Sequence, residues 1–433
     1  MKRIAIVTCA LAMAAGTANA QGLTMQMSNG WNFSFSGNVN AFLVYTDPKC
    51  NTVVEDGAGG GGSSCGFAGS LVPANETAKT SAIRTGLLPA FATFEAKGKE
   101  GGVDLGVHFG FAPQINNAGG VHDNFGNGTQ AGAQIDMRQV YLTAGGTWGQ
   151  ILAGREIGLY QRGNILNDMT LFGVGPSGGG GAGTGGGTTL GRIGFGYVYP
   201  NFVAQMTYSS PASSPAQISI GLFDPSDIGE YDVTKIPRVE SEFTWTGHFG
   251  ATTAEAPKGA DKVMIFASGE WQHVQTVTGQ IVSGEQTSKD SYGGAGGVRA
   301  DFSGLSLVGS GFYGKGIGSV LMFDSGNEVD NVGEFRNTYG FIGQAEFQPM
   351  GTKWKFGASY GENDLKQTAD DDSRFGSDNA PFLKKNSAIV GSITYLWTKS
   401  LRWVAEYTYT KATSHDGAES TANQGAVGMM LFF

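Results

Sequence analysis

The chain has 433 residues and a formal net charge of −9, and charged residues make up only 15% of it. Soluble domains usually carry about 25% charged residues, so this chain has too little charge to cover the surface of a soluble protein of its size. The acidic balance also argues against a nucleic-acid partner, which would need a basic surface. Glycine is abundant, with 71 residues, whereas proline is rare, with 13. This composition favours one large β-barrel over several soluble domains.

Residues 1–20 have the three parts of an export signal. Lys2 and Arg3 supply positive charge, residues 4–15 are apolar, and Ala18-Asn19-Ala20 has the small-x-small pattern of a signal-peptidase site. We expect cleavage there, which leaves residues 21–433 as one mature domain. No later stretch approaches the roughly 18 continuous apolar residues that a transmembrane helix needs, so a membrane location would require a barrel.

Two cysteines remain in the mature chain, because Cys9 lies in the signal peptide. Cys50 and Cys65 enclose a glycine-rich stretch, and the oxidising periplasm allows their thiols to join. We expect a disulfide between Cys50 and Cys65. Two free thiols are the alternative, since sequence alone does not establish the geometry that a disulfide requires.

Apolar and polar residues alternate with a period of two along most of the mature chain, which is typical of strands with one lipid face and one wet face. In residues 31–45, Phe35 and Leu43 share one face, whereas Ser34 and Asn40 share the other. The pattern recurs in residues 103–111, 238–246, 335–347 and 402–410. A soluble β-sandwich would show the same alternation, so the connections must distinguish the two folds.

Very short links alternate with long polar ones between the expected strands. Short links lie at residues 98–102, 145–147, 302–304, 350–353 and 399–401, and long ones at 47–79, 113–133, 156–190, 277–290, 317–333, 364–384 and 412–421. Tight turns at one rim and long loops at the other are the layout of an outer-membrane barrel with periplasmic turns. One link, residues 248–261, is expected to be an unusually long periplasmic turn.

With this alternation enforced, the sequence predicts an all-β fold, a transmembrane antiparallel up-and-down β-barrel of about 16 strands. The strands are expected at residues 31–46, 79–97, 101–112, 134–145, 147–155, 191–209, 216–224, 238–247, 262–276, 291–302, 304–316, 334–348, 353–363, 385–398, 401–411 and 423–433. The apolar parity changes within residues 191–209, and we interpret Pro200 as a β-bulge. A turn there would instead raise the count to about 18 strands and put the following tight turns on the wrong rim.

Two segments resemble the general, trimeric porin family of Gram-negative outer membranes. Residues 139–155 (QVYLTAGGTWGQILAGR) are similar to the family's hairpin before its third loop, and residues 427–433 (VGMMLFF) to its C-terminal insertion signal. The resemblance implies a homotrimer in outer-membrane lipid and lipopolysaccharide, with the signal at Phe433 read by the barrel-assembly machinery. It also implies that the third loop, residues 156–190, folds into the barrel and narrows it to an eyelet.

In that family, acidic loop residues face basic wall residues across the eyelet. The resemblance implies pore-constriction roles for Glu156 and Asp168 on the loop and for Arg138, Arg155 and Arg192 on the wall. Thr93 stands where the family commonly has a wall arginine, and Arg84, higher on the same expected strand, is the candidate substitute. An arginine on a lipid face costs about 2–4 kcal/mol at mid-bilayer, which independently points Arg138 and Arg192 into the lumen.

No pattern points to catalysis, a cofactor or a metal centre. Residues 173–178 fit G-x-G-x-x-G but lead into more glycine and no helix, so they do not form a dinucleotide fingerprint. The five histidines lack ligand spacing. Asp370, Asp371 and Asp372 form either a solvated acidic loop or a place where Ca²⁺ binds or bridges lipopolysaccharide. We therefore expect a protein that is not an enzyme.

These features predict a water-filled channel for passive diffusion of small hydrophilic solutes and ions, because a barrel of about 16 strands is wide enough to leave an aqueous lumen. A substrate-selective outer-membrane channel is the first alternative, which regularly spaced aromatic residues in the lumen would favour. A secreted β-rich binding or adhesive protein is the second. Heat-modifiable migration of the protein from the outer-membrane fraction would distinguish this last class from a barrel.

The expected disulfide provides a first test. It would tie down only the residues between Cys50 and Cys65, whereas the barrel depends on its closed hydrogen-bonded ladder. The double variant Cys50→Ser, Cys65→Ser is therefore expected to insert and to show the heat-modifiable migration of the parent protein. Failure of this variant to insert would contradict the expectation.

Overall fold

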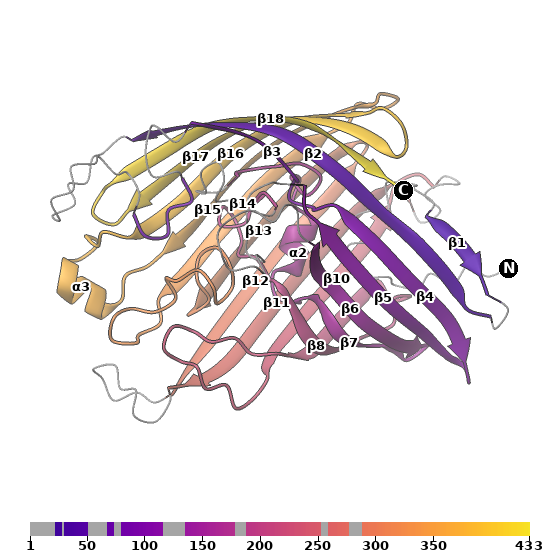
Figure 1. The fold of residues 1–433 in the computed structure, drawn as a ribbon, viewed down its shortest axis with the longest axis horizontal. Helices are drawn as coiled ribbons and strands as arrows, with labels where there is room; N and C mark the ends of the chain where they lie inside the picture. Colours follow the sequence, from indigo (N-terminus) through magenta and orange to yellow (C-terminus); the bar gives the residue numbers. More distant parts are fainter. Residues whose placement is uncertain are drawn as a thin grey trace.

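The structure is a computed structural model and describes residues 22–27, 30–50, 67–72, 79–115, 135–177, 188–252, 259–276 and 288–433. Most of these residues belong to one antiparallel sheet that closes on itself (Figure 1). The sheet has 18 strand segments. Two of them, β3 and β4, are halves of one wall strand, and β1 is a short addition beside the start of β2. The wall is thus a closed 16-strand barrel, as the sequence predicts.

The wall strands alternate in direction and follow one another around the barrel in chain order. They are β1 (Leu23–Gln26), β2 (Asn32–Cys50), β3 (Thr80–Arg84), β4 (Phe91–Glu100), β5 (Val103–Pro113), β6 (Ile135–Gly146), β7 (Gly149–Ile157), β8 (Phe202–Ser209), β9 (Ala216–Phe223), β10 (Arg238–Phe249), β11 (Asp261–Gln275), β12 (Ser288–Phe302), β13 (Leu305–Lys315), β14 (Asn337–Phe347), β15 (Trp354–Leu365), β16 (Leu383–Leu396), β17 (Leu401–Ser414) and β18 (Glu419–Phe432). The described residues also form two short helices, α2 (Arg162–Leu166) and α3 (Ala369–Phe375). Neither is long and apolar enough to cross a membrane.

The first and last strands of the described residues, β1 and β18, both pair with β2, where the barrel closes. Strand β18 pairs with β2 from Ser420 opposite Cys50 to Phe432 opposite Asn38. Beyond it, Phe433 exchanges two backbone hydrogen bonds with Gly37, at 2.9 and 3.0 Å. Strand β1 pairs with the remaining part of β2, with Leu23 opposite Phe35. Figure 1 shows β1 and the C-terminus at the same end of the barrel.

Alternation along the strands decides which side chains face lipid. On β2, Val39 and Leu43 are exposed on the outside, whereas Asn38 and Asn40 are buried on the inside. The C-terminal strand behaves in the same way, with exposed Val427, Met429 and Leu431 and buried Met430 and Phe432. The outer surface is therefore apolar and the inner surface largely polar, as expected for a membrane barrel.

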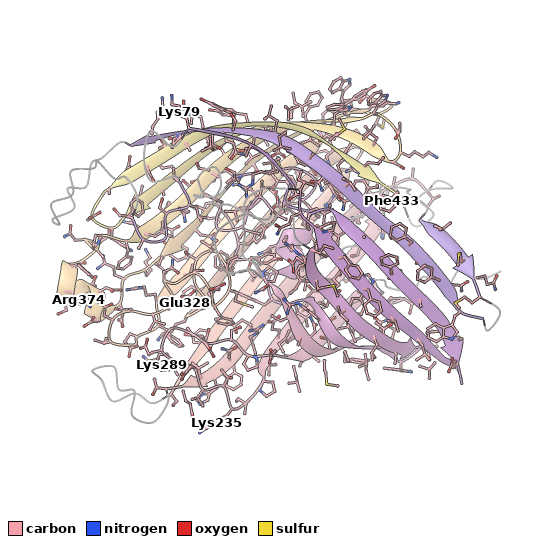
Figure 2. The ribbon with its side chains drawn as sticks, viewed as in Figure 1. Lys79, Lys235, Lys289, Glu328, Arg374 and Phe433 are labelled. Atoms are coloured by element: carbon pink, nitrogen blue, oxygen red, sulfur yellow. The ribbon has the colours of Figure 1, made fainter. Side chains whose placement is uncertain are left out.

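The two rims differ as the sequence predicts. Most links at the rim near the C-terminus are tight turns, and the exposed Trp148, Trp354 and Trp397 lie beside them. The long loops and α3 lie at the opposite rim, where Figure 2 labels Lys235, Lys289, Glu328 and Arg374. One expected long loop is in fact short, because β17 extends to Ser414 and β18 starts at Glu419. Residues 412–421 are thus mostly strand, which corrects that expectation.

The second wall strand is interrupted, although the sequence predicts a continuous strand over residues 79–97. It pairs with β2 through β3 and β4 but not through residues 85–90 between them. There, the Asn40 side chain accepts from the Gly86 N–H at 2.8 Å and donates to the Leu88 carbonyl at 3.0 Å. Asn38 donates to the Pro89 carbonyl at 3.1 Å. Because proline has no N–H to give to a ladder, these amide side chains replace the missing backbone pairs.

The expectation of a strand over residues 191–209 with a bulge at Pro200 is wrong for its first half. Only Phe202–Ser209 forms β8, and residues 191–201 belong to the third loop inside the barrel. Ile193, Phe195 and Tyr197 alternate as in a strand, but all three are buried within the loop. The change of parity at Pro200 marks the point where the chain passes from the loop to the wall.

Two expectations concern residues outside the described part of the chain. The signal peptide, residues 1–20, lies wholly outside it, and so does Cys65. Cleavage after Ala20 and the disulfide between Cys50 and Cys65 therefore stay predictions.

The interrupted strand yields a stability prediction. Replacing Asn40 with alanine removes the partners of the Gly86 N–H and the Leu88 carbonyl, and each unsatisfied buried group costs about 1–3 kcal/mol. We expect the temperature at which the barrel loses its fast-migrating folded form on a gel to fall. Asn423→Ala is the matched control, because among the described residues the Asn423 side chain accepts one hydrogen bond, from the hydroxyl of the exposed Tyr407 at 2.6 Å. Equal transition temperatures for the two variants would contradict the prediction.

Candidate functional site

The third loop enters the barrel after β7 and occupies its interior. It runs from Gly158 through α2 to Ser177, and its return limb runs from Thr188 to Asn201 before β8. Figure 1 shows α2 inside the ring of strands. The described parts of both limbs are mostly buried. An inward third loop is what the sequence predicts.

The first part of the loop is fixed to the wall at β10 and β11. The Tyr160 N–H donates to Glu240 at 2.9 Å, and the Gln161 N–H donates to the Ser268 hydroxyl at 3.0 Å. Arg162 forms a two-point ion pair with Glu242 at 2.6 and 3.0 Å. Such two-point pairs fix orientation as well as distance.

The next part of the loop crosses to β14, β17 and β18. Gln344 accepts from the Met169 N–H at 2.8 Å and donates to the Asn167 carbonyl at 3.0 Å. Glu406 accepts from the Val174 and Gly175 N–H groups at 3.0 and 2.7 Å. Gln424 continues this pattern, accepting from the Ser177 N–H at 2.9 Å. Wall side chains thus hold the loop backbone on the inner face of strands far along the chain.

Asp168 lies at the centre of the loop and not on its pore side. It accepts from the Arg192 N–H at 3.0 Å, from the Tyr197 hydroxyl at 2.7 Å, and from both the N–H and the hydroxyl of Thr170 at 2.8 and 2.6 Å. Burial raises the pKa of its carboxyl, and the hydrogen bonds from Thr170 and Tyr197 oppose this shift. The carboxyl therefore joins the two limbs of the loop.

Arg192 and Arg84 also hold the loop. Arg192 is fully buried, and its guanidinium donates to the Ala388 carbonyl on β16 at 2.8 Å. Burial lowers the pKa of Arg192 to about 10, and nearby Asp168 opposes this shift. Arg84, on β3, donates to the loop carbonyls of Ser177 and Thr188 at 3.1 and 3.4 Å. Both arginines face inward, but the guanidinium of Arg192 binds wall backbone and that of Arg84 binds loop backbone.

Arg138 and Glu156 lie on the wall formed by β4 to β7, in two separate networks. Arg138 forms an ion pair with Asp136 at 2.8 Å beside a register shift of β6. Glu156 accepts from Gln139 at 2.8 Å. The second network continues from Gln139 to His108 at 3.3 Å and on to Glu95 and Lys97. Acidic and basic groups therefore alternate on this wall and compensate one another.

The structure does not bring Arg155 to the constriction. Arg155 is exposed and is two residues from Ala153 on β7. Ala153 pairs with Leu142 on β6 and with Met206 on β8. Leu142 and Met206 are exposed apolar residues of the outer face. Because alternate residues share a face, Arg155 points outward, which corrects the expected pore-lining position.

The loop presents apolar side chains to the lumen, which the resemblance did not imply. Leu166, Met169 and Phe172 are the partly exposed apolar residues of the described outgoing limb. The two acidic candidates, Asp168 on this limb and Glu156 at the end of β7, are both buried. The spacing of three residues among the apolar positions is the one sequence signal for this surface.

A vestibule of about 820 Å³ lies between the loop and the tight-turn rim. Met169 and Phe172 contribute to it from the loop. Its cations are Arg299, Lys353, Lys355, Lys399 and Arg402, and its acidic residues are Asp301, Glu346 and Glu406. Asp301 pairs with Arg299 and Lys262, Glu346 pairs with Lys355, and Glu406 is occupied by the loop backbone. The vestibule therefore carries a surplus of positive charge.

The acidic run at residues 370–372 forms part of α3 at the long-loop rim. Asp371 is buried, pairs with Arg336 at 2.7 Å and completes a capping box with Thr368. This residue has a structural role at the helix start. Across the described ranges, no group of three or more histidine, cysteine, aspartate or glutamate residues could hold a metal ion.

Comparison with known proteins shows the fold of Gram-negative outer-membrane porins and channels. The outer membrane channel DcaP of Acinetobacter baumannii matches with a TM-score of 0.64 and 14% identity, over 94% of this chain and 99% of that one. An anion-selective porin from Comamonas acidovorans matches with a TM-score of 0.56 and 12% identity, over 93% and 100%. Salmonella typhi OmpF, solved with daunomycin, matches with a TM-score of 0.54 and 14% identity, over 95% of this chain and 100% of that one. No family model and no curated protein matches the sequence.

The position of Asp168 yields a prediction about the loop. In Asp168→Asn, an amide group cannot accept all the hydrogen bonds from Arg192, Tyr197 and Thr170, and each one lost costs about 1–3 kcal/mol. We expect the two limbs to separate more often, which should increase current noise in single channels and speed protease cleavage within the loop.

Asp227→Asn is the control, because Asp227 is an exposed residue at the long-loop rim. It should leave both measurements unchanged. A selectivity shift in Asp168→Asn without added noise or cleavage would instead indicate that Asp168 faces the pore.

Proposed function

We propose that this protein is an outer-membrane porin that forms a water-filled channel for passive diffusion of small hydrophilic solutes and ions. The observation that carries the proposal is a closed wall of 16 strands, apolar outside and polar inside, whose third loop narrows the interior. Porin structures share this fold over more than nine-tenths of the chain. The apolar outer face argues against a secreted adhesive protein, since such a face needs a lipid environment.

The channel prefers small anions. The loop buries its acidic residues in hydrogen bonds, whereas the vestibule keeps cations without an acidic partner. Charges in a narrow passage with low-dielectric walls are poorly screened, so this surplus acts on a passing ion. Anion selectivity is also named for the porin from Comamonas acidovorans.

The protein acts as a homotrimer in the outer membrane, with its tight turns in the periplasm. A trimer form is named for the similar OmpT of Vibrio cholerae. Here the first strands offer an apolar outer face, with exposed Val39, Leu43, Ile83 and Phe109. Phe433 ends the chain at the closing seam, which agrees with a C-terminal signal for the barrel-assembly machinery.

Selectivity in a planar bilayer tests the proposed function. Under a KCl gradient, the wild-type channel should show a reversal potential whose sign indicates that chloride is more permeant than potassium. Changing Lys353 and Lys399 together to glutamate should lower the chloride-to-potassium permeability ratio by about two-fold or more, because four units of charge change at the vestibule. The effect should shrink at high salt, where the Debye length falls to about 3 Å.

The control for this experiment is a charge change far from the vestibule. Lys235 is exposed at the long-loop rim (Figure 2), so Lys235→Glu should leave the permeability ratio nearly unchanged. Reversal potentials of cation-preferring sign in the wild type would contradict the anion preference. Absence of any conductance would contradict the channel itself.

A further inference from the structure

A further inference concerns Arg402, which lines the vestibule from the start of β17. It lies on the inner face of β17, opposite Leu396 and Met430. Only 9% of the residue is exposed, and it lines the vestibule together with Phe172 and Met169 of the third loop. A cation is thus enclosed at the point where the loop meets the wall.

Two aromatic rings hold the guanidinium in place. Its central carbon lies 4.6 Å from the centre of the Phe172 ring and 4.8 Å from that of Phe432. The two rings themselves meet edge to face, 5.7 Å apart at 78°. They form a corner that attracts the cation through its two faces and limits the orientations that its planar group can take. Such restraint lowers the entropy cost of binding a ligand.

Arg402 differs from the other arginines inside the wall in having no acceptor. Arg238 pairs with Glu240, Arg299 with Asp301, and Arg336 with Asp371. Within the described residues, the Arg402 side chain makes neither a hydrogen bond nor an ion pair, and its nitrogens are not sealed from solvent. A guanidinium has five N–H donors, so this one presents unused donors to the vestibule.

The surroundings select the kind of anion. The planar fork of arginine matches the two oxygens of a carboxylate. Apolar groups of Met169, Phe172 and Leu396 line the same cavity and can contact an organic body behind that carboxylate. The nearby Lys355 is paired with Glu346 at 2.6 Å and Arg299 with Asp301, whereas the unpaired Arg402 is held by two aromatic rings. This arrangement suits a singly charged organic acid better than a highly charged phosphate.

We propose that Arg402, in the corner formed by Phe172 and Phe432, is the main ligand-binding residue of a subsite for small organic carboxylates on the vestibule wall. The inference rests on the proposed channel function and deepens it, because such a subsite would hold an organic acid at the inner end of the constriction. Carboxylates would then cross by a saturable route, in contrast with neutral solutes of the same shape.

Current blockade in a planar bilayer tests the subsite. Benzoate added to the wild-type channel should reduce chloride current with a saturable dose response, whereas benzamide, which is neutral and similar in shape, should not. In Arg402→Gln the half-blocking benzoate concentration should rise at least about ten-fold, because a charge-assisted hydrogen bond is worth about 1.5–3 kcal/mol. Arg402→Lys keeps the charge but not the fork, so it should show an intermediate value.

Two further variants separate the subsite from general effects. Lys411→Gln removes one charge from the same strand, at the long-loop end, where Lys411 pairs with Glu419. Its half-blocking concentration should stay within about two-fold of wild type. Phe172→Leu leaves Arg402 in place but removes one ring of the corner, and it should weaken benzoate blockade several-fold. This variant also decides the matter if Arg402→Gln fails to show heat-modifiable migration and so does not fold.

The outcomes are distinguishable from a failure of the channel proposal. Equal benzoate blockade in the wild type and in the folded Arg402 or Phe172 variants overturns the subsite while the channel stands, and so does equal blockade by benzamide. Inorganic phosphate competing as strongly as benzoate overturns the selection of carboxylates. If the wild type does not conduct, calorimetric titration of benzoate into the detergent-solubilised protein replaces the current. No binding heat for the wild type in that titration overturns the subsite too.

Discussion

Within a bilayer a backbone N–H or C=O group has no water to bond, so each must find a partner in the protein. This requirement governs the whole wall. The backbone groups of sixteen strands form hydrogen bonds with those of their neighbours around the barrel, and the last strand must pair with the first. The seam at β2 meets this demand with two strands, since β18 and Phe433 pair along most of the length of β2 and β1 covers the remainder. The position of β1 and β18 beside β2 is therefore part of the closure.

The same requirement links the third loop to the wall. Where the second wall strand leaves the ladder, its backbone turns toward the loop, and Leu87 and Leu88 donate to the carbonyls of Gly173 and Leu171 at 3.0 and 3.2 Å. The side chains of Asn38 and Asn40 on β2 provide hydrogen bonds to the backbone groups that face β2. Loop and wall thus complete one hydrogen-bonded structure. The width of the channel is set by the same bonds that keep the wall closed.

Acidic side chains provide much of this attachment, and the electrostatics of the lumen follow from that use. Glu240 and Glu406 accept from loop N–H groups, and Asp168 joins the two limbs of the loop. A carboxylate occupied by backbone donors contributes less to the field in the open lumen than one facing water. The vestibule cations are left with too few acidic partners. The proposed anion preference would therefore arise from acids being buried and not from many added bases.

Strand alternation predicts most of the wall, because a period of two directly reports which side chains meet lipid and which meet water. It fails where apolar residues alternate for another reason, as at Ile193, Phe195 and Tyr197, which pack within the loop. Local pattern also cannot reveal that Glu406 would bind Val174, 232 residues away in the chain. The outward position of Arg155 could have been derived, since it shares parity with Ile151 and Ala153 on β7.

The charge of the pore depends on register more than on composition. The chain is acidic overall, with a net charge of −9, yet the vestibule is basic. The net charge of the chain and the charge of the vestibule differ because the charges are separated in space. Acidic residues such as Glu328, Asp330 and Asp371 lie at the long-loop rim. Lys353, Lys399 and Arg402 line the vestibule on the other side of the third loop. A shift of one residue along a strand exchanges its faces and would move a lumen charge into lipid. Selectivity is thus fixed by the same pairing that fixes the wall.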